Sequence, residues 1–464
     1  MKRFIAIAVC GVLLAACARS NSPKSGGSGS TTPTSGSDAS NARSADFGSV
    51  RQVCRTGRPT GSPTVGVSPT EIHVGVFSDT GFAGRPGLNQ EFWDTAKVFS
   101  QWCNDRGGIN GRKIVIDERD AALTNVKARM VESCEQDFAL VGGGAVFDQD
   151  GVETRLQCLL PDISGFVVSP KARGADLVVQ PLPNPTSELG IGAMRYLDKK
   201  FPAATSHVGV LTGDIATTKI VADQNRAAAE SIGWKIVYND AYPPAGISDW
   251  TPYAQKIKDT GTKGLIWVGD PDGLAPLLGA LRDIGYTLDF VRADANHYDQ
   301  KLISNAGASL TPRNVFIQSA FFPFERAKAS DATGQYLAAF QKYLPNGKQR
   351  TYLGLQAWSA WVLFAKSAQT CGNDLTRRCL YDAARKVHAW TGGGLHAQTD
   401  PGAGGAVPCY VVMRASPSGF TLVTDHAPNQ GIYNCGPKNV FALPASDQQS
   451  TTLADVGKTI ADMK

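Results

Sequence analysis

Three consecutive glycines, Gly142 to Gly144, follow the short apolar segment FALV, which is typical of a buried strand. Ala145, Val146 and Phe147 come next, and Asp148 stands where it can cap a following helix. Glycine lets the backbone approach a ligand closely, so the N–H groups of this stretch could hold a small carboxylate. The alternative interpretation is that the glycines only permit a tight turn.

The glycines do not match a nucleotide-binding motif. A dinucleotide fingerprint needs GxGxxG with an acidic residue about 20 positions further on, and a P-loop needs GK followed by Ser or Thr. The stretch GGGAVFDQDG satisfies neither pattern. The residue types therefore favour a small carboxylate over a nucleotide phosphate, and we expect no cofactor.

Small and polar residues also follow the other predicted strands. In an open parallel sheet, ligands bind beyond the carboxyl ends of the strands, where the first N–H groups of helices are free. The residues at these ends are therefore candidate ligand contacts. In chain order they are Ser78, Asp79, Thr80, Gly142 to Ala145, Ser169, Pro170, Lys171, Gly213, Asp214, Gly269, Asp270, Arg292, Ala293 and Asp294.

The elements that must position these residues alternate between strand and helix, which predicts parallel sheets wound with helices. The first unit has expected strands at 72–77, 113–118, 138–141 and 165–168, with helices at 92–103, from about 125, and at 152–159. The second unit has expected strands at 207–212, 234–238, 264–269, 289–294 and 314–322, with helices between them. The fold class is therefore α/β, with two doubly wound units.

Three further segments complete this organisation. Prolines between Gln180 and Glu188 mark a crossing between the units. Residues 330–387 are helical without strands of their own, so they must pack on one of the sheets. Strand-like segments at 409–414 and 420–424 predict a hairpin added to the other sheet.

The N-terminus has the pattern of an export signal. Residues 1–17 combine a basic start, an apolar run and small residues before a cysteine, and the run is too short to span a membrane. Leu14 to Cys17 resemble the lipobox of bacterial lipoproteins, which implies cleavage before Cys17 and a lipid on its thiol; the alternative is plain secretion. We expect the protein on the outer face of the cytoplasmic membrane, anchored rather than spanning.

The segment that follows the signal is rich in Ser, Gly, Thr and Pro. From Ala18 to Gly48, Phe47 is the only large apolar side chain. Such a segment buries too little apolar surface to offset the entropy of ordering it. We predict a disordered tether over residues 18–64.

Eight cysteines follow Cys17, an even number that predicts disulfides in an exported protein. The connectivity does not follow from the sequence, but CGNDLTRRC closes a short loop and favours Cys371 with Cys379. Chain proximity gives weaker indications for Cys54 with Cys103, Cys134 with Cys158, and Cys409 with Cys435. We expect no metal site, because no CxxC occurs and no histidine stands at ligand spacing beside a cysteine pair.

Length and charge exclude some classes of function. The chain has 464 residues, enough for two domains, and 42% of them are apolar, as in an ordinary globular protein. With 46 basic and 41 acidic residues the net charge is only +5. We therefore expect no nucleic acid among the partners.

Several motifs resemble the Leu/Ile/Val-binding branch of type I periplasmic binding proteins, the solute receptors of ABC importers. The segments are IHVGVFSDTGFAGRPG, WCNDRGGINGRKIVID, LVGGG, the dipeptide SP at Ser169 and Pro170, and YLGLQAWSAW; they run in order from about Ile72 to Val423. The resemblance implies two lobes joined by three crossings, which close on a ligand like a Venus flytrap. It implies an N-terminal lobe at 65–183 and 324–394, a C-terminal lobe at 184–323 and 395–440, and a tail at 441–464.

The resemblance also implies roles for particular residues. The loop that binds a ligand carboxylate falls on Gly144, Ala145, Val146 and Phe147, the second loop falls on Lys171 and Ala172, and the acidic partner of an α-ammonium group falls on Asp294. The family's aromatic residue over the side-chain pocket has no counterpart, since Arg85 and Pro86 stand in the first loop, and its tyrosine in the second lobe is replaced near Thr217. The candidate ligand-binding residues are Thr80, Arg85, Gly144, Ala145, Val146, Phe147, Ser169, Lys171, Ala172, Asp214, Thr217, Asp270 and Asp294.

Ordinary structural roles compete with these assignments. Asp294 could cap a helix beginning near Tyr298 or pair with Arg292, and Lys171 and Arg85 could be solvated surface cations. Core or cleft packing is the default for Trp267 and Tyr298.

The function that we expect is capture of a small polar solute by a monomeric receptor that serves an ABC permease. An amino acid, an amide, a urea-like compound and another small carboxylate all remain open. We do not expect an enzyme, because neither HExxH nor GxSxG occurs. The alternatives are a clamshell lipoprotein that signals to a partner and, less favoured, a hydrolase.

Overall fold

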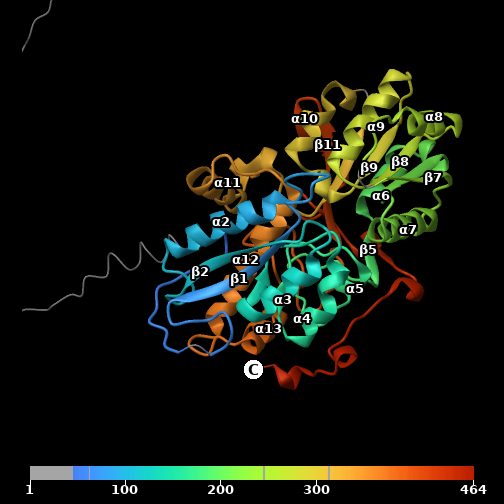
Figure 1. Ribbon diagram of the computed structural model, residues 1–464. Helices are drawn as coiled ribbons and strands as arrows, with labels where there is room; N and C mark the ends of the chain where they lie inside the picture. Colours follow the sequence, from blue (N-terminus) through green and yellow to red (C-terminus); the bar gives the residue numbers. More distant parts are fainter. Residues whose placement is uncertain (1–44, 62, 244–245, 312–313, 464) are drawn as a thin grey trace, which may run out of the picture.

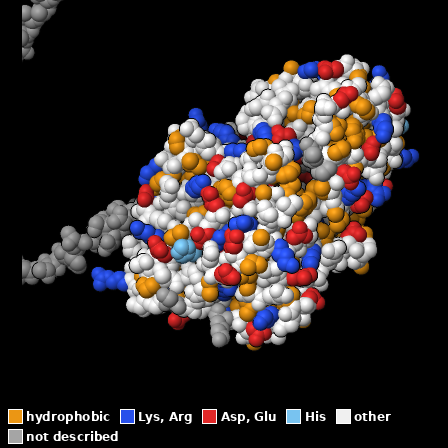
Figure 2. Space-filling model, viewed as in Figure 1, with side chains coloured by type: hydrophobic (Ala, Val, Ile, Leu, Met, Phe, Trp, Pro, Cys, Tyr) orange, Lys and Arg blue, Asp and Glu red, His pale blue; other side chains and the backbone are white. Residues whose placement is uncertain are grey.

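The computed structural model describes residues 45–61, 63–243, 246–311 and 314–463, which form two lobes (Figure 1). The predicted signal, the lipidation site Cys17 and residues 18–44 of the predicted tether lie outside the described residues. Within the described ranges, no helix is both long and apolar enough to cross a membrane. Figure 2 shows basic and acidic side chains interspersed over one face of both lobes, without a broad area of one sign.

The N-terminal lobe contains a four-stranded parallel sheet in the order β2-β1-β3-β4. Its strands are β1 (Glu71–Ser78), β2 (Lys113–Asp120), β3 (Ala139–Val141) and β4 (Asp162–Ile163). The helices that connect and follow these strands are α2 (Gln90–Asn104), α3 (Val126–Gln136), α4 (Val152–Gln157) and α5 (Pro170–Arg173). The predicted alternation of strand and helix in this unit is confirmed.

The prediction of the fourth strand at 165–168 is wrong. The strand β4 consists only of Asp162 and Ile163, and the chain then leaves the sheet. The N–H groups of Gly165 and Phe166 both donate to the Gly143 carbonyl at 3.1 Å, so these residues fold over the glycine segment instead of extending the sheet.

The helical region predicted at 330–387 packs on this same lobe. It forms α11 (Asp331–Tyr343), α12 (Tyr352–Thr370) and α13 (Arg377–Arg385), and α12 contacts α2, β3 and β4. Each helix begins after a Ser or Thr whose side chain accepts a backbone N–H: Ser330, Thr351 and Thr376. These caps define where the three helices start.

The C-terminal lobe contains a larger sheet in the order β12-β11-β10-β9-β8-β6-β7, with β13 beside β11. The strands are β6 (Val208–Gly213), β7 (Ile236–Tyr242), β8 (Gly264–Val268), β9 (Phe290–Ala293), β10 (Val315–Ser319), β11 (Cys409–Ser416), β12 (Gly419–Leu422) and β13 (Asn434–Cys435). The helices are α6 (Gly192–Lys200), α7 (Ala216–Ser231), α8 (Thr251–Asp259), α9 (Pro271–Asp283) and α10 (Gln300–Ala306). The strands β6 to β10 pair in parallel, and the predicted hairpin β11–β12 joins them antiparallel to β10, as expected.

Alternation of side chains explains why the central strand β8 is buried on both faces. Ile266 and Val268 belong to a core with α6 and α7, whereas Leu265 and Trp267 belong to the core with α9. Successive residues of a strand point to opposite faces, so a strand between two helical layers must be apolar throughout.

The lobes are joined where the chain passes between the sheets. The strand β5 (Glu188–Gly190) pairs antiparallel with β14 (Val440–Ala442) at this junction. Beyond β14 the tail returns along one side to the N-terminal lobe, shown in red in Figure 1. There Thr451 bridges to Ala175 and the Leu453 N–H donates to Asp176 at 2.8 Å. The tail therefore adds a further passage to the three predicted crossings.

The tether prediction is wrong for residues 45–54. Ala45, Phe47, Val53 and Cys54 are buried, and the Phe47 ring lies 5.3 Å from that of Trp358. The average composition of the predicted tether did not reveal that residues 45–54 pack on the N-terminal lobe. One aromatic ring and one disulfide hold this otherwise polar stretch there. The four predicted disulfides are all present: Cys54–Cys103, Cys134–Cys158, Cys371–Cys379 and Cys409–Cys435.

Candidate functional site

Two adjoining cavities lie between the lobes. We call the one of about 400 Å³ the outer chamber and the one of about 300 Å³ the hinge chamber. Residues shared by both linings are Phe166, Val168, Thr218, Gly269, Asn296 and Leu353. Because both lobes contribute to each lining, both cavities depend on how the lobes are arranged.

The outer chamber has a mainly apolar wall with charged groups at its rim. The N-terminal lobe contributes Phe82, Arg85, Leu88, Val146 and Phe147 to it, among others. The C-terminal lobe contributes Ile215, Tyr242, Asp270, Pro271 and Asp272, among others. The Tyr242 ring stacks on Trp267 with the ring centroids 4.9 Å apart, which fixes the orientation of this wall.

The glycine segment is shaped by close packing. Gly142 has a left-handed φ of 67°, and a Cβ there would lie 2.6 Å from the indole nitrogen of Trp361. A Cβ on Gly143 would lie 2.6 Å from the Phe77 nitrogen, and one on Gly144 would lie 2.6 Å from the Phe166 carbonyl oxygen. All three positions therefore require glycine to bring the segment against its neighbours, and the turn interpretation accounts for them.

Asp79, at the end of β1, holds the residues that follow the glycines. Its buried carboxylate accepts the N–H of Val146 and that of Leu123, both at 2.8 Å. Burial raises the pKa of Asp79, and the two backbone donors oppose this shift. The Val146 N–H is thus already paired, so it is not free to bind a carboxylate.

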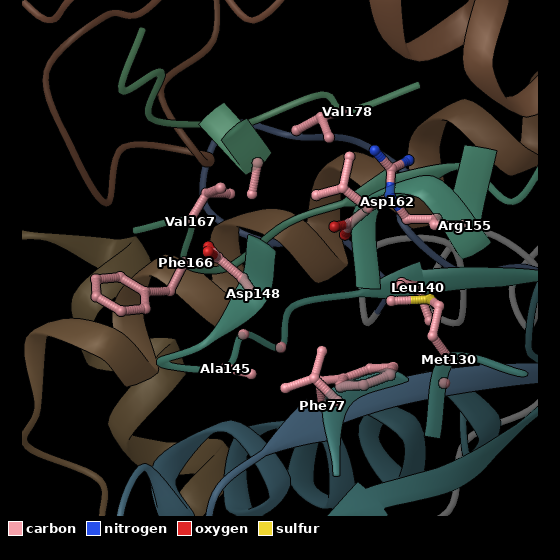
Figure 3. A pocket seen from close by; sticks show the side chains of 16 residues that line it. Phe77, Met130, Leu140, Ala145, Asp148, Arg155, Asp162, Phe166, Val167 and Val178 are labelled. Atoms are coloured by element: carbon pink, nitrogen blue, oxygen red, sulfur yellow. The ribbon is translucent and has the colours of Figure 1, made fainter. Parts of the chain in front are cut away.

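Asp148 ties the first candidate loop to the second. It accepts the N–H of Val168 at 2.7 Å and that of Ser169 at 3.1 Å. Figure 3 shows Asp148 pointing across a small cavity inside the N-terminal lobe toward the segment with Val167, while Phe166 points away. Burial raises the pKa of Asp148 to about 6. The two loops are therefore joined through this carboxylate.

An ion pair crosses the cleft at the rim of the outer chamber. Arg85 of the N-terminal lobe pairs with Asp270 and lies 3.6 Å from Asp272, both at the start of α9. The Arg85 side chain is only 12% exposed. Asp270 also caps α9 by accepting the Gly273 N–H at 2.9 Å, and Lys301 lies 2.6 Å from Asp272. The lobes are therefore in direct contact, as in a closed arrangement.

A second contact between the lobes lies in the hinge chamber. The Arg173 guanidinium, on α5, donates to the carbonyls of Asn184 and Pro185 and, at 3.0 Å, to the Gln224 side chain on α7. Burial lowers the pKa of Arg173 to about 10, so it stays charged at neutral pH. Asp294 lines the same chamber, and its carboxylate pairs with Arg292.

The structure separates the candidate residues into three groups. Arg85, Val146, Phe147, Asp270 and Asp294 line the cleft. Gly144, Ala145 and Ala172 line the small cavity of Figure 3, behind the cleft. Thr80, Ser169, Lys171, Asp214 and Thr217 line neither chamber.

Three residues of the last group have polar contacts away from the chambers. Lys171 pairs with Glu153 at 2.7 Å, and Asp214 pairs with Lys219, so both carry surface ion pairs. The Ser169 hydroxyl caps α5 by accepting the Ala172 N–H at 3.1 Å. The Thr217 side chain is buried, and its neighbour Thr218 faces both chambers, because one step along a helix turns the side chain by about 100°.

Two kinds of cleft residue escaped the sequence analysis. Tyr242 ends β7, so the strand-end rule could have found it. The polar residues of the hinge chamber, such as Gln180, Asn184 and Gln318, lie on the crossings or inside a strand. No local pattern marks those positions.

The two sheet-based lobes contact each other, and both of them line the chambers between them. This arrangement is that of a two-lobed solute-binding protein. The sequence model of the family described as periplasmic binding protein matches residues 71–420. The chain belongs to the periplasmic binding protein family, as predicted. Solved structures with this fold are described as substrate-binding proteins of ABC transporters, and none of those reported below is described as an enzyme.

Solved structures of this class share the fold. A fatty acid ABC transporter substrate-binding protein from Thermomonospora curvata has a TM-score of 0.66 at 15% identity, covering 80% of this chain and 95% of that one. A possible leucine/isoleucine/valine-binding protein from Rhodopirellula baltica has a TM-score of 0.64 at 12% identity, covering 76% and 96%. The branched-chain amino acid transporter substrate binding protein LivJ from Streptococcus pneumoniae, in complex with isoleucine, has a TM-score of 0.62 at 15% identity, covering 76% and 99%. No curated protein sequence matches this chain significantly.

Proposed function

We propose that this protein is a solute-binding lipoprotein of an ABC importer, and that its solute is an organic carboxylate with an apolar part. The observation that carries the proposal is the outer chamber, which combines an apolar wall from both lobes with charged groups at its rim. A pocket of about 400 Å³ has the size of a small-molecule site.

The rim supports recognition of a charged head group. Cations Arg85, Lys301 and Lys348 stand there beside acidic residues Glu91, Asp270, Asp272 and Asp299. Groups of both signs suit a carboxylate, alone or within a zwitterion. The fatty acid, leucine and isoleucine named for the similar structures share a carboxylate joined to an aliphatic chain, which fits this combination.

The mechanism is a shift in the population of lobe arrangements. A solute that contacts Phe147 on one lobe and Tyr242 on the other binds the closed form more tightly than the open form, so its binding favours closure. The Arg85–Asp270 pair forms only when the lobes meet, so it adds to the stability of the closed form. The closed protein would then deliver its solute to a membrane permease.

The proposed location rests on the N-terminal pattern. Cleavage before Cys17 and lipidation of its thiol would hold the monomer at the outer face of the cytoplasmic membrane, with residues 18–44 as a tether. Labelling of cells with a radioactive fatty acid tests this: the wild-type chain should carry label and Cys17→Ala should not. Label on the variant would contradict the anchor.

Thermal unfolding with a panel of solutes tests the ligand class. The panel comprises leucine, isoleucine, hexanoic acid, octanoic acid and leucinamide, which lacks the carboxylate. A ligand present at 100 times its Kd should add about 2.7 kcal/mol to the free energy of unfolding. We expect this from a carboxylate and not from leucinamide, together with a smaller radius of gyration by X-ray scattering.

Matched variants locate the site. Phe147→Ala should weaken binding at least tenfold because it removes apolar contact in the outer chamber, whereas Lys171→Gln, outside both chambers, should leave it unchanged. Stabilisation without compaction, or equal losses in both variants, would contradict the proposal.

A further inference from the structure

The hinge chamber differs in chemistry from the outer chamber. Its lining includes amide side chains from several elements, namely Gln180 and Asn184 from the first crossing, Gln224 and Asn225 from α7, Gln318 from β10 and Gln356 from α12. The charged groups beside them already have partners. Arg173 donates to three oxygens, Arg292 pairs with Asp294, and Glu188 accepts the Ala406 N–H at 2.8 Å.

Polar atoms of this lining have no partner among the described residues. They are Gln224 Nε2, Asn225 Oδ1, Arg292 Nε and Gln356 Oε1. Gln224 and Asn225 are each 1% exposed, and Arg292 is 5% exposed. A buried polar atom without a hydrogen bond costs about 1 to 3 kcal/mol, so several on one cavity indicate that something else satisfies them.

The known contacts fix which atoms are free. The Gln224 oxygen accepts from Arg173, which leaves its NH₂ group as a donor. The Asn225 NH₂ group donates to the Val221 carbonyl at 2.8 Å, which leaves its oxygen as an acceptor. Neighbouring positions of α7 thus offer one donor and one acceptor, the pattern that a neutral primary amide or urea group matches with its C=O and N–H.

We propose that the hinge chamber is a second subsite, which takes a neutral amide or urea-type group at the far end of the solute. This inference rests on the proposed function, because the carboxylate and the apolar part would occupy the outer chamber. The chambers share Val168, Thr218 and Asn296, so one extended molecule can reach both. A charged end is disfavoured in the hinge chamber, since Arg173 and Arg292 are paired and buried and a further buried charge would lack a counter-ion. The rim of the outer chamber differs, because its cations Lys301 and Lys348 are 43% and 36% exposed.

Adaptation of the lining requires only small motions. The free atoms are sealed from solvent, so the amide groups must turn to meet a guest. The terminal torsions of Asn and Gln are broad, which makes such rotation inexpensive. Ordered water is the alternative occupant, because water also satisfies buried polar groups.

Calorimetric titration of the full chain tests whether an amide group or only ordered water occupies the hinge chamber. It uses three linear probes with the same number of carbon atoms. They are hexanoic acid, 6-amino-6-oxohexanoic acid, which ends in a primary amide, and adipic acid, which ends in a second carboxylate. We expect the amide-ended acid to bind at least tenfold more tightly than either of the others. Similar Kd values for all three would overturn the subsite and leave the proposed function standing. Binding by none of the three would count against the proposed carboxylate site itself.

Variants of the lining give the second readout. Asn225→Leu keeps the shape but removes the acceptor, and should reduce the preference for the amide-ended acid to less than threefold. Gln356→Leu should act in the same direction, so a folding defect in one variant does not leave the question open. Gln255→Leu, on the exposed surface of α8, is the matched control and should retain the full preference. An unchanged preference in both lining variants would overturn the proposal.

Discussion

The two lobes share an architecture but are stabilised differently. The C-terminal lobe has a seven-strand path of paired strands and one disulfide, Cys409–Cys435, between β11 and β13 at the sheet. The N-terminal lobe has four strands, of which β3 and β4 contain only three and two residues. It carries the other three disulfides.

Buried arginines follow the same division. The N-terminal lobe buries five arginines, namely Arg112, Arg119, Arg155, Arg173 and Arg377. In the described part of the C-terminal lobe only Arg292 is buried. Arg377 donates to the carbonyls of Phe138, Cys158, Cys134 and Asp137. Short strands leave carbonyls without ladder partners, and a guanidinium with five N–H donors satisfies several of them together. Side chains in this lobe therefore replace part of the sheet.

The largest expected effect is from a disulfide of the N-terminal lobe. Loss of Cys54–Cys103, with a sequence separation of 49, should cost up to about 4 kcal/mol, because the bond restricts a long loop of the unfolded chain. Loss of Cys371–Cys379, with a separation of 8, should cost about 2.5 kcal/mol. Denaturant unfolding of the two double Cys→Ala variants measures both costs. A smaller cost for losing Cys54–Cys103 would show that this disulfide does not anchor residues 45–54.

Replacement of a buried guanidinium comes next. Arg377→Met should lower the free energy of unfolding by about 3 kcal/mol, because it leaves buried carbonyls without donors. The adjacent Arg378, half-exposed and paired with Asp382, is the control, and Arg378→Met should cost about 0.5 kcal/mol. Equal losses in chemical denaturation would show that buried arginines are not what distinguishes this lobe.

The pH dependence of Asp148 should have an intermediate effect. Its folded pKa, about 6, lies above the ordinary value of 3.8, so the stability that the protonated group contributes is complete below about pH 4 and lost as the pH rises through 6. Asp148→Asn mimics the protonated form. As the pH rises from 4 to 7, the free energy of unfolding of the variant should therefore increase by about 2 kcal/mol relative to that of wild type. This figure allows for Asp148 being half-buried.

Unfolding curves at pH 4, 5, 6 and 7 measure this difference. Burial also raises the pKa of Asp137 to about 6, but Asp137 is present in both proteins and its contribution cancels. A pH-independent difference between variant and wild type would contradict the assignment to Asp148.

The smallest expected effect concerns the contact between the lobes. Arg85→Ala removes the pair with Asp270 and should destabilise the closed form relative to the open form by about 1 kcal/mol. The equilibrium between the two lobe arrangements should therefore shift roughly fivefold toward the open form. X-ray scattering should show a larger mean radius of gyration. Lys219→Ala breaks the exposed pair with Asp214 within one lobe and should leave the radius unchanged. A response of both variants would mean that general charge, not the cross-lobe pair, controls closure.

Much of the fold was accessible from the sequence because its signals are local. Apolar runs such as Gly264–Val268 and helical spacing such as that of Phe92, Ala96 and Phe99 mark elements wherever they pack. The predictions of the fourth strand and of the tether over residues 45–54 were wrong for the same reason. In each, a long-range contact decided the structure: Gly143 with Phe166 in the first, and Phe47 with Trp358 in the second.

The site was accessible only in part. The strand-end rule selected Asp270 and Asp294, the family resemblance selected Phe147, and all three side chains line the chambers between the lobes. The strand-end rule could not distinguish Asp270, which meets Arg85 across the cleft, from Asp214, which pairs with Lys219 on the surface. Both are aspartates at the end of a parallel strand, and their difference lies in what the other lobe places opposite them.

The sequence by itself determined the alternating elements and the two units, because both depend on periodicity along the chain. It favoured the cysteine pairs through their short separations without fixing the connectivity. The tertiary structure alone decided which residues form the outer and hinge chambers. Arg85 and Asp270 are 185 positions apart, and Gln224 and Gln356 lie on helices of different lobes. Such residues meet only when two separately folded halves come together, and no local pattern records that arrangement.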